Sequence, residues 1–286
     1  MIQPLTYRPN EKVLCEIQAI EETRNDLQRK VEDSPTLEDY CRSFISSCGG
    51  HEFLDKVRTS QTIKVLDIGF GRGETSLYLA SLGHEVHSIE PSPLNCEILQ
   101  NASSKYRQKI SIYQGTAENF DQIDEADFDL CLFNSSLHHC DDPIQVLQTC
   151  QKKLKKSGKV IAINEPILKF YRSKKWFYNK LETDPVAVGH YGGNEHIYYY
   201  HEYLSLFKRA GFSSAEGLLH IKNREPRLIL EEDLQRKACG KYVCSDSKLL
   251  IKFSIFLLLK NLWSPPIIAL GKKLSLFSYS FEGVNQ

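Results

Sequence analysis

The chain has 286 residues, of which 41% are hydrophobic and 10% aromatic, so it is long enough to bury one large core. Its 36 Lys and Arg residues balance 36 Asp and Glu residues, and this zero net charge disfavours binding to duplex nucleic acid. The 9 cysteines include no Cys-x-x-Cys pair, so we expect reduced core thiols and no zinc site built on cysteine. The N-terminus lacks a basic start followed by an apolar core, so we expect no secretory signal and a cytoplasmic protein.

Residues 11–57 are predicted to be helical, because apolar positions recur near helical spacing among charged ones. We place a helix N-cap at Ser34, with Pro35 in the first turn, and a stop at Gly49 and Gly50. No phosphate loop or metal motif occurs in this part of the chain. Residues 1–60 are therefore interpreted as a helical cap over the domain that follows.

From residue 63 onward, short apolar runs alternate with helical segments. Strands are predicted at 63–70, 85–92, 110–120, 128–136, 159–166, 213–222 and 274–286. Helices are predicted at 73–83, 93–106, 142–158, 167–182 and 201–212, and a loop at 183–200. This alternation predicts an α/β fold with a seven-stranded, mostly parallel sheet and helices on both faces. In such sheets, ligands bind at the carboxyl ends of the strands.

The stretch VLDIGFGRG, at 65–73, indicates a nucleotide site without phosphates. A dinucleotide-binding turn has a third glycine where this chain has Glu74, and a phosphate loop has a Lys that is missing here. Asp67 and Glu74 would also repel a pyrophosphate. An acid followed by three glycines favours a ligand that carries an ammonium group, which the backbone approaches closely. Glu90 ends the next strand, where a carboxylate can accept hydrogen bonds from ribose hydroxyls.

With these features the chain resembles the class I S-adenosylmethionine-dependent methyltransferases over about residues 60–215. The resemblance rests on VLDIGFGRG, on IEPS around Glu90, on QGTAENF at 114–120, and on LHH followed by DP and a helix ending in LKKSGKV. It implies a Rossmann-like fold and S-adenosylmethionine as the cofactor. The cofactor-binding residues that it implies are Asp67, Gly69, Phe70, Gly71, Gly73, Glu90, Pro91, Ala117, Glu118, Asn134 and Ser135.

Methyl transfer to a hydroxyl requires that the hydroxyl lose its proton, and histidine titrates in the useful range. His138 and His139 follow the fourth predicted strand, and His196 lies in a glycine-containing loop of the type that forms lids. These three are the candidate bases, and structural packing is the alternative for each. Residues predicted to contact the substrate are Glu165, Tyr171, Trp176, His190, Tyr191 and Glu195.

Two patterns restrict the chemistry within the resembled family. Asn134 and Asn164 stand where metal-dependent members carry acids, so we expect no metal. The fourth strand is not followed by Pro-Pro, which disfavours DNA as the acceptor. The resemblance therefore implies O-methylation of a sugar, a glycan precursor or a natural product. N- or C-methylation of a small molecule is an alternative, and a cofactor-binding scaffold without turnover is another.

The predicted domains are a cap at 1–60, a cofactor-binding core at 61–221 with 275–286, and a helical insertion at 222–274 before the last strand. The apolar segment at 249–270 contains lysines and is too short to span a bilayer. It is interpreted as a lid, as the contact of a homodimer or as a peripheral membrane contact.

Overall fold

The computed structural model describes residues 2–45, 57, 61–168, 172–184, 195–221 and 277–285. The predicted helix stop at Gly49 and Gly50 lies outside these residues, and so does the insertion predicted at 222–274. Three predicted substrate contacts also lie outside them: Tyr171, His190 and Tyr191.

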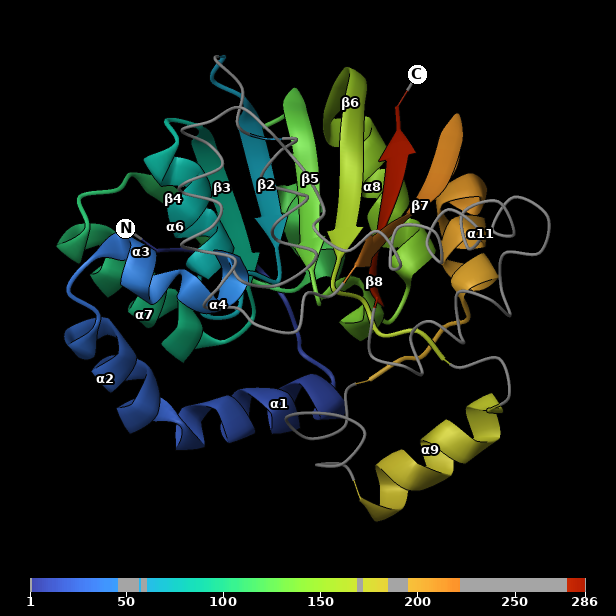
Figure 1. Ribbon diagram of the computed structural model, residues 1–286, viewed down its shortest axis with the longest axis horizontal. Coiled ribbons are helices and arrows are strands. Elements are labelled where there is room, and N and C mark those ends of the chain that lie inside the picture. The colour runs from blue at the N-terminus through green and yellow to red at the C-terminus, as the bar shows by residue number, and fades with distance from the viewer. Residues whose placement is uncertain are drawn as a thin grey trace, which may run out of the picture.

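One sheet, in the order β1-β4-β3-β2-β5-β6-β8-β7, forms the centre of the molecule (Figure 1). Its strands are β1 Ile2–Pro4, β2 Lys64–Ile68, β3 Glu85–Glu90, β4 Ile110–Gln114, β5 Phe128–Asn134, β6 Leu154–Ile163, β7 Ser214–Ile221 and β8 Phe277–Val284. Every pairing is parallel except those of β8, which runs antiparallel to both β6 and β7. The mostly parallel α/β fold is confirmed.

The strand β1 was not predicted, so the described sheet has eight strands where the sequence indicated seven. Ile2 pairs with Ile112 of β4, and Leu5 N–H continues the ladder by donating to the Gln114 carbonyl at 2.9 Å. A segment of three residues that contains a proline shows no period-2 pattern, and its strand conformation depends on the edge offered by β4.

Helices cover both faces of the sheet because alternate strand residues point in opposite directions. Leu66 and Phe133 belong to the core under α8, Pro143–Lys153, and α11, Tyr200–Ala210. Val65 and Leu132 belong to the opposite core, together with Leu79 of α6, Glu74–Ser81. Helix α7, Pro93–Lys105, packs beside α6 against β4 and β1.

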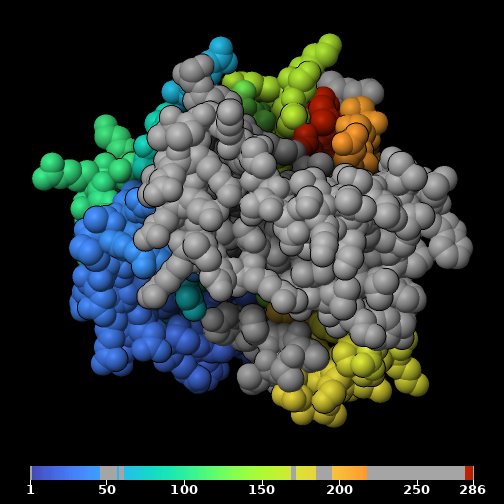
Figure 2. All heavy atoms as spheres, viewed as in Figure 1, coloured from blue at the N-terminus to red at the C-terminus, as the bar shows by residue number. Residues whose placement is uncertain are grey.

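Two predicted helix boundaries differ from the structure by more than two residues. The helix predicted to reach residue 158 ends at Lys153, because Leu154 is buried and pairs with Phe128 in the sheet. The helix predicted at 167–182 is α9, Lys174–Thr183, which begins where the Ser173 side chain accepts a hydrogen bond from Trp176 N–H. Upstream of it, Ile167 forms a β-bridge with Tyr198. The space-filling view shows α9, in yellow, at the edge of the molecule (Figure 2).

Within the predicted cap, residues 11–45 are mostly helical, whereas residues 2–4 belong to the sheet. The helices of the cap are α1 Glu11–Glu22, α2 Arg24–Asp33, α3 Leu37–Tyr40 and α4 Arg42–Ile45. The predicted N-cap at Ser34 is wrong: Thr36 caps α3 by accepting from Asp39 N–H at 3.1 Å. Ser34 instead ends α2, and its carbonyl accepts from Tyr106. Helix α1 lies across the carboxyl ends of the parallel strands (Figure 1).

Among the described residues, we find no helix with the length and apolar character that a bilayer span requires.

Candidate active site

A cavity of about 520 Å³ lies where β2, β3 and β5 end. This volume falls within the range of small-molecule and cofactor sites. Residues of the glycine loop, of the end of β3 and of 115–118 form one part of the wall, and residues at the end of β5 form another. The cap closes the cavity with side chains that the sequence analysis did not single out: Val13, Glu16, Ile20, Thr23, Leu27, Ser43 and Phe44.

The glycine loop exposes backbone to this cavity. Gly71 has a φ of 53°, and a Cβ added there would meet no atom within 4 Å, so the loop is open at this point. Gly69 has a φ of 71°, and a Cβ there would lie 2.6 Å from Cβ of Ser136. The two glycines therefore serve different needs, since Gly71 leaves room for a ligand and Gly69 lets the loop pack against the turn after β5.

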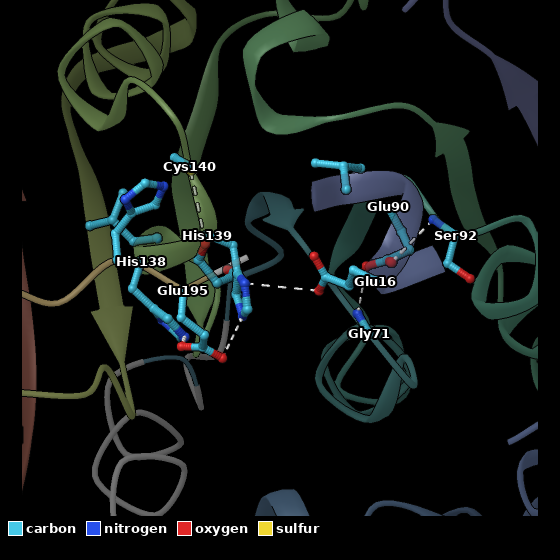
Figure 3. A network of polar contacts seen from close by, with 12 residues as sticks. Glu16, Gly71, Glu90, Ser92, His138, His139, Cys140 and Glu195 are labelled. Atoms are coloured by element: carbon cyan, nitrogen blue, oxygen red, sulfur yellow. Dashed lines mark hydrogen bonds and ion pairs between the residues drawn. The ribbon is translucent and has the colours of Figure 1, made fainter. Parts of the chain in front are cut away.

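The Glu90 carboxylate is fixed on the cavity wall. One oxygen accepts from Gly71 N–H at 3.0 Å, and the other accepts from Ser92 N–H and Asn95 Nδ2, each at 3.2 Å (Figure 3). The side chain is only 5% exposed, and burial raises its pKa although these hydrogen bonds work in the opposite direction. A carboxylate held in this way is preorganised to accept bonds from a ligand's hydroxyls.

Asp67 lies behind the wall of the cavity. Its Oδ2 accepts from Ser76 Oγ at 2.6 Å, whereas the buried Oδ1 has no hydrogen-bond partner. Burial, more than the nearby Glu90, raises the pKa of Asp67 to about 7. Of the predicted cofactor residues, Asp67 and Gly73 do not border the cavity. The others do: Gly69, Phe70, Gly71, Glu90, Pro91, Ala117, Glu118, Asn134 and Ser135.

These features fit S-adenosylmethionine. The open backbone at Gly71 admits a ligand, the Glu90 carboxylate suits a ribose diol, and the unsatisfied oxygen of Asp67 suits a nearby positive charge.

Glu74 connects the loop to the cap. Its carboxylate accepts from Ser43 Oγ at 2.6 Å and from Phe44 N–H at 2.8 Å, and it pairs with Lys30 of α2. In the same region, Tyr40 Oη donates to the Arg72 carbonyl at 2.6 Å. Glu74, which in the sequence disfavoured a pyrophosphate ligand, thus holds the cap over the cavity.

His138 is buried between two carboxylates in the 3-10 turn η2, Leu137–His139. Its Nδ1 lies 2.7 Å from Glu165 Oε2, and its Nε2 lies 3.1 Å from Glu195 Oε2. Burial would lower the pKa of His138, but the two carboxylates outweigh burial and raise that pKa to about 9. At neutral pH, His138 is therefore an imidazolium that donates on both sides. It does not border the cavity.

Glu165 organises this turn. It accepts from the backbone N–H groups of Ser136, Leu137 and His138 at 3.0–3.2 Å, in addition to the His138 ring. Its side chain is fully buried and does not border the cavity, so its role here is to hold the backbone of the turn.

His139 is the candidate base that borders the cavity. Its Nε2 lies 3.9 Å from Glu195 Oε1, and its Nδ1 lies 3.9 Å from Glu16 Oε1 of α1 (Figure 3). Both distances are longer than a hydrogen bond. His139 is thus the place where the η2 turn, the cap and Glu195 meet.

Two other predicted residues lie away from the cavity. His196 Nε2 is 3.7 Å from Asp141 Oδ1, and burial lowers the pKa of His196. Trp176 is 37% exposed on α9, with the Arg172 guanidinium 4.2 Å from its ring centroid. Neither residue borders the cavity.

Asn134 and Asn164 form a pair at the ends of β5 and β6. Asn164 Nδ2 donates to Asn134 Oδ1 at 2.8 Å, and Asn134 Nδ2 donates to Thr75 Oγ1 at 2.9 Å. Both residues border the cavity. The pair presents neutral amide groups where acids would favour a metal.

The fold and the cavity can now be compared with those of known protein families. Residues 66–162 match the family model described as a methyltransferase domain. This match covers about a third of the chain and agrees with the resemblance to the class I S-adenosylmethionine-dependent methyltransferases.

The similar proteins do not specify the substrate of this chain. The ubiquinone biosynthesis O-methyltransferase of Maricaulis maris is 28% identical over 39% of this chain and 44% of its own length. The chain thus spans less than half the length of this curated relative. Phosphoethanolamine N-methyltransferase 2 of Haemonchus contortus is 18% identical, with a TM-score of 0.51 over 82% of this chain and 51% of that one. A chain from a Haloferax volcanii complex of a methyltransferase with its Trm112 activator is 14% identical, with a TM-score of 0.56 over 98% of this chain and 99% of that one. These two structures support the fold.

Proposed function

We propose that this protein transfers the methyl group of S-adenosylmethionine to a hydroxyl oxygen of a small molecule. The observation that carries the proposal is that one cavity has the Glu90 carboxylate on its wall and also His139, near the cap residue Glu16 (Figure 3). Glu90 would hold the ribose and Gly71 would admit the cofactor backbone. The acceptor would then lie at the His139 side.

When bound, S-adenosylmethionine supplies a methyl group on a sulfonium, and sulfur keeps the electron pair of the broken C–S bond as the O–C bond forms. The residues of this chain must align the acceptor, exclude water and assist the loss of its proton. Both ring nitrogens of His138 already donate to carboxylates, and His196 does not border the cavity. His139 is thus the histidine placed to act on the acceptor hydroxyl.

The polar groups around His139 suit a hydroxylated acceptor. Glu16, Glu118 and Asn164 border the same cavity, and their oxygens can accept from several hydroxyls. A sugar, a glycan precursor or a hydroxylated natural product has this chemistry. The name of the Maricaulis relative, an O-methyltransferase, supports oxygen as the methylated atom.

The test has two stages. Calorimetry with S-adenosylhomocysteine should give saturable binding with one site per chain, and a screen of hydroxylated and amino acceptors should then find turnover on a hydroxyl. In His139→Asn, turnover should fall while the affinity for S-adenosylhomocysteine stays unchanged. His201→Asn, on the exposed side of α11, is the matched control that should behave as the wild type. Absence of binding heat would refute the cofactor assignment, and turnover on amines alone would replace oxygen by nitrogen.

A further inference from the structure

Three donor side chains converge beside the cavity. One ligand atom each from His138, His139 and Glu195 lies within 4.8 Å of the other two. The Nε2 atom of His138 is 3.1 Å from Glu195 Oε2, and that of His139 is 3.9 Å from Glu195 Oε1. Two imidazoles and a carboxylate are the donor set of many catalytic zinc sites.

The second ring nitrogen of each histidine also faces a carboxylate. His138 Nδ1 is 2.7 Å from Glu165, which the backbone of η2 holds in place, and His139 Nδ1 is 3.9 Å from Glu16. Histidines that bind metals commonly donate their other N–H to a carboxylate, which orients the ring and makes it a better ligand. Such an outer partner lies at hydrogen-bonding distance from His138, and for His139 the Glu16 carboxylate lies nearby, at 3.9 Å.

We propose that His138, His139 and Glu195 bind one divalent transition-metal cation of the zinc type. Around a tetrahedral ion with ligands at about 2.0–2.1 Å, donor atoms lie about 3.3 Å apart. The three donor atoms here lie within 4.8 Å of one another, so the side chains must move closer together to bind the ion. The cation displaces the proton that His138 shares with Glu195. Because His139 borders the cavity, an ion held by these three donors would lie next to it.

A second cluster of donor side chains lacks these properties. Glu85, His87 and Glu125 also bring ligand atoms together, but Lys64 Nζ lies 2.5 Å from Glu125 and 3.4 Å from Glu85. The ammonium of Lys64 already supplies the positive charge that these acids require.

This metal site adds a means of activating the acceptor to the proposed function. It rests on the proposed function in one respect, namely that the acceptor lies at the His139 side of the cavity. A cation in this position binds the acceptor oxygen and lowers the pKa of the hydroxyl, and the released proton goes to water. His139 then acts as a ligand of the cation instead of taking the proton itself. The expectation of no metal was based on Asn134 and Asn164, whereas the present donors lie in the turn after β5 and at Glu195.

The experiment measures metal binding without turnover. The full chain, freed of metal with a chelator, is titrated with Zn²⁺ against a chromophoric competitor, and with Co²⁺ to record its visible absorption. We expect one ion per chain. His139→Asn and Glu195→Gln should each bind more than about 100-fold more weakly, and the outer-partner variant Glu16→Gln about 10-fold more weakly. His201→Asn, an exposed histidine elsewhere, should bind as the wild type does.

His139→Asn leaves the bonds of His138 to Glu165 and Glu195 in place, so this variant should fold, which circular dichroism verifies. Equal Zn²⁺ affinity in the wild type, His139→Asn and Glu195→Gln would overturn the metal site, and so would the absence of binding. Methyl transfer that persists in metal-free protein would also overturn the role in acceptor activation. If the metal binds as expected but no hydroxyl acceptor is ever methylated, the proposed function fails and the metal site stands.

Discussion

The two sides of the cavity are built in different ways. The proposed cofactor side comes from one continuous β-α-β segment, in which Gly71 N–H donates to the Glu90 carboxylate at 3.0 Å. The acceptor side comes from three distant segments, since Glu16, His139 and Glu195 meet only in the folded chain. A ligand held largely by backbone requires a local sequence motif. An acceptor held by side chains requires only that the fold bring the right residues together. The residues on the acceptor side can therefore differ between proteins, and they form no recognisable sequence motif.

The largest effect should come from removing the support of the acceptor side. Glu165→Ala leaves the buried charge of His138 with one carboxylate fewer and three N–H groups of η2 without an acceptor. We expect the free energy of unfolding to fall by about 3–5 kcal/mol, measured by urea denaturation. Glu22→Ala, at an exposed position of α1, should change it by less than about 0.5 kcal/mol. A loss from Glu165→Ala no larger than that of the control would show that the turn does not depend on this carboxylate.

On the cofactor side, Glu90→Gln removes the charged acceptor of the proposed ribose contact. Hydrogen bonds to charged groups contribute about 1.5–3 kcal/mol, so S-adenosylhomocysteine should bind about 10–100-fold more weakly by calorimetry. Binding of Zn²⁺ should remain unchanged in this variant, because Glu90 does not belong to the donor cluster. A change in both affinities would show that the two sides of the cavity are not separable.

A smaller effect on the cofactor side concerns pH. The pKa of Asp67 is raised to about 7, so its carboxyl is mostly neutral at pH 6 and mostly charged at pH 8. A ligand with an ammonium group favours the charged form, so affinity for S-adenosylhomocysteine should increase with pH across this range, by up to about tenfold per unit. Calorimetry on Asp67→Asn should give a flatter dependence. An equally steep increase in that variant would assign the pH effect to another group.

The smallest effect concerns the cap that spans both sides. Lys30→Met removes the cation paired with Glu74, and the Lys30 side chain is 24% exposed. Partly exposed pairs contribute little, so stability should fall by about 1 kcal/mol or less. Hydrogen exchange at Phe44 N–H, which donates to Glu74, should become faster. Unchanged exchange at that amide would mean that Lys30 does not help to hold the cap.

The features that the sequence predicts are those encoded by a local motif, and the features that it misses depend on contacts between distant segments. The strands around Asp67 and Glu90 were found because apolar runs, glycines and an acid follow one another within a short segment. Strand β1 was missed because its pairing depends on β4, more than a hundred residues away. His138 and His139 were identical candidates in the sequence. Only the fold distinguishes them, since it buries one between Glu165 and Glu195 and leaves the other at the cavity. The roles of Glu16 and of Glu74 depend on how the cap docks, which no local pattern encodes.

The position of Glu16 has a consequence for the kinetics of the reaction. Val13, Glu16 and Ile20 of α1 close the cavity in which the cofactor is proposed to bind, while Glu16 also faces His139. We expect the cofactor to occupy the cavity beneath α1 first, so that the acceptor then binds at Glu16 and His139 next to it. The two substrates should therefore add in a fixed order, cofactor first and acceptor second. Product inhibition by S-adenosylhomocysteine should then be competitive with the methyl donor and non-competitive with the acceptor.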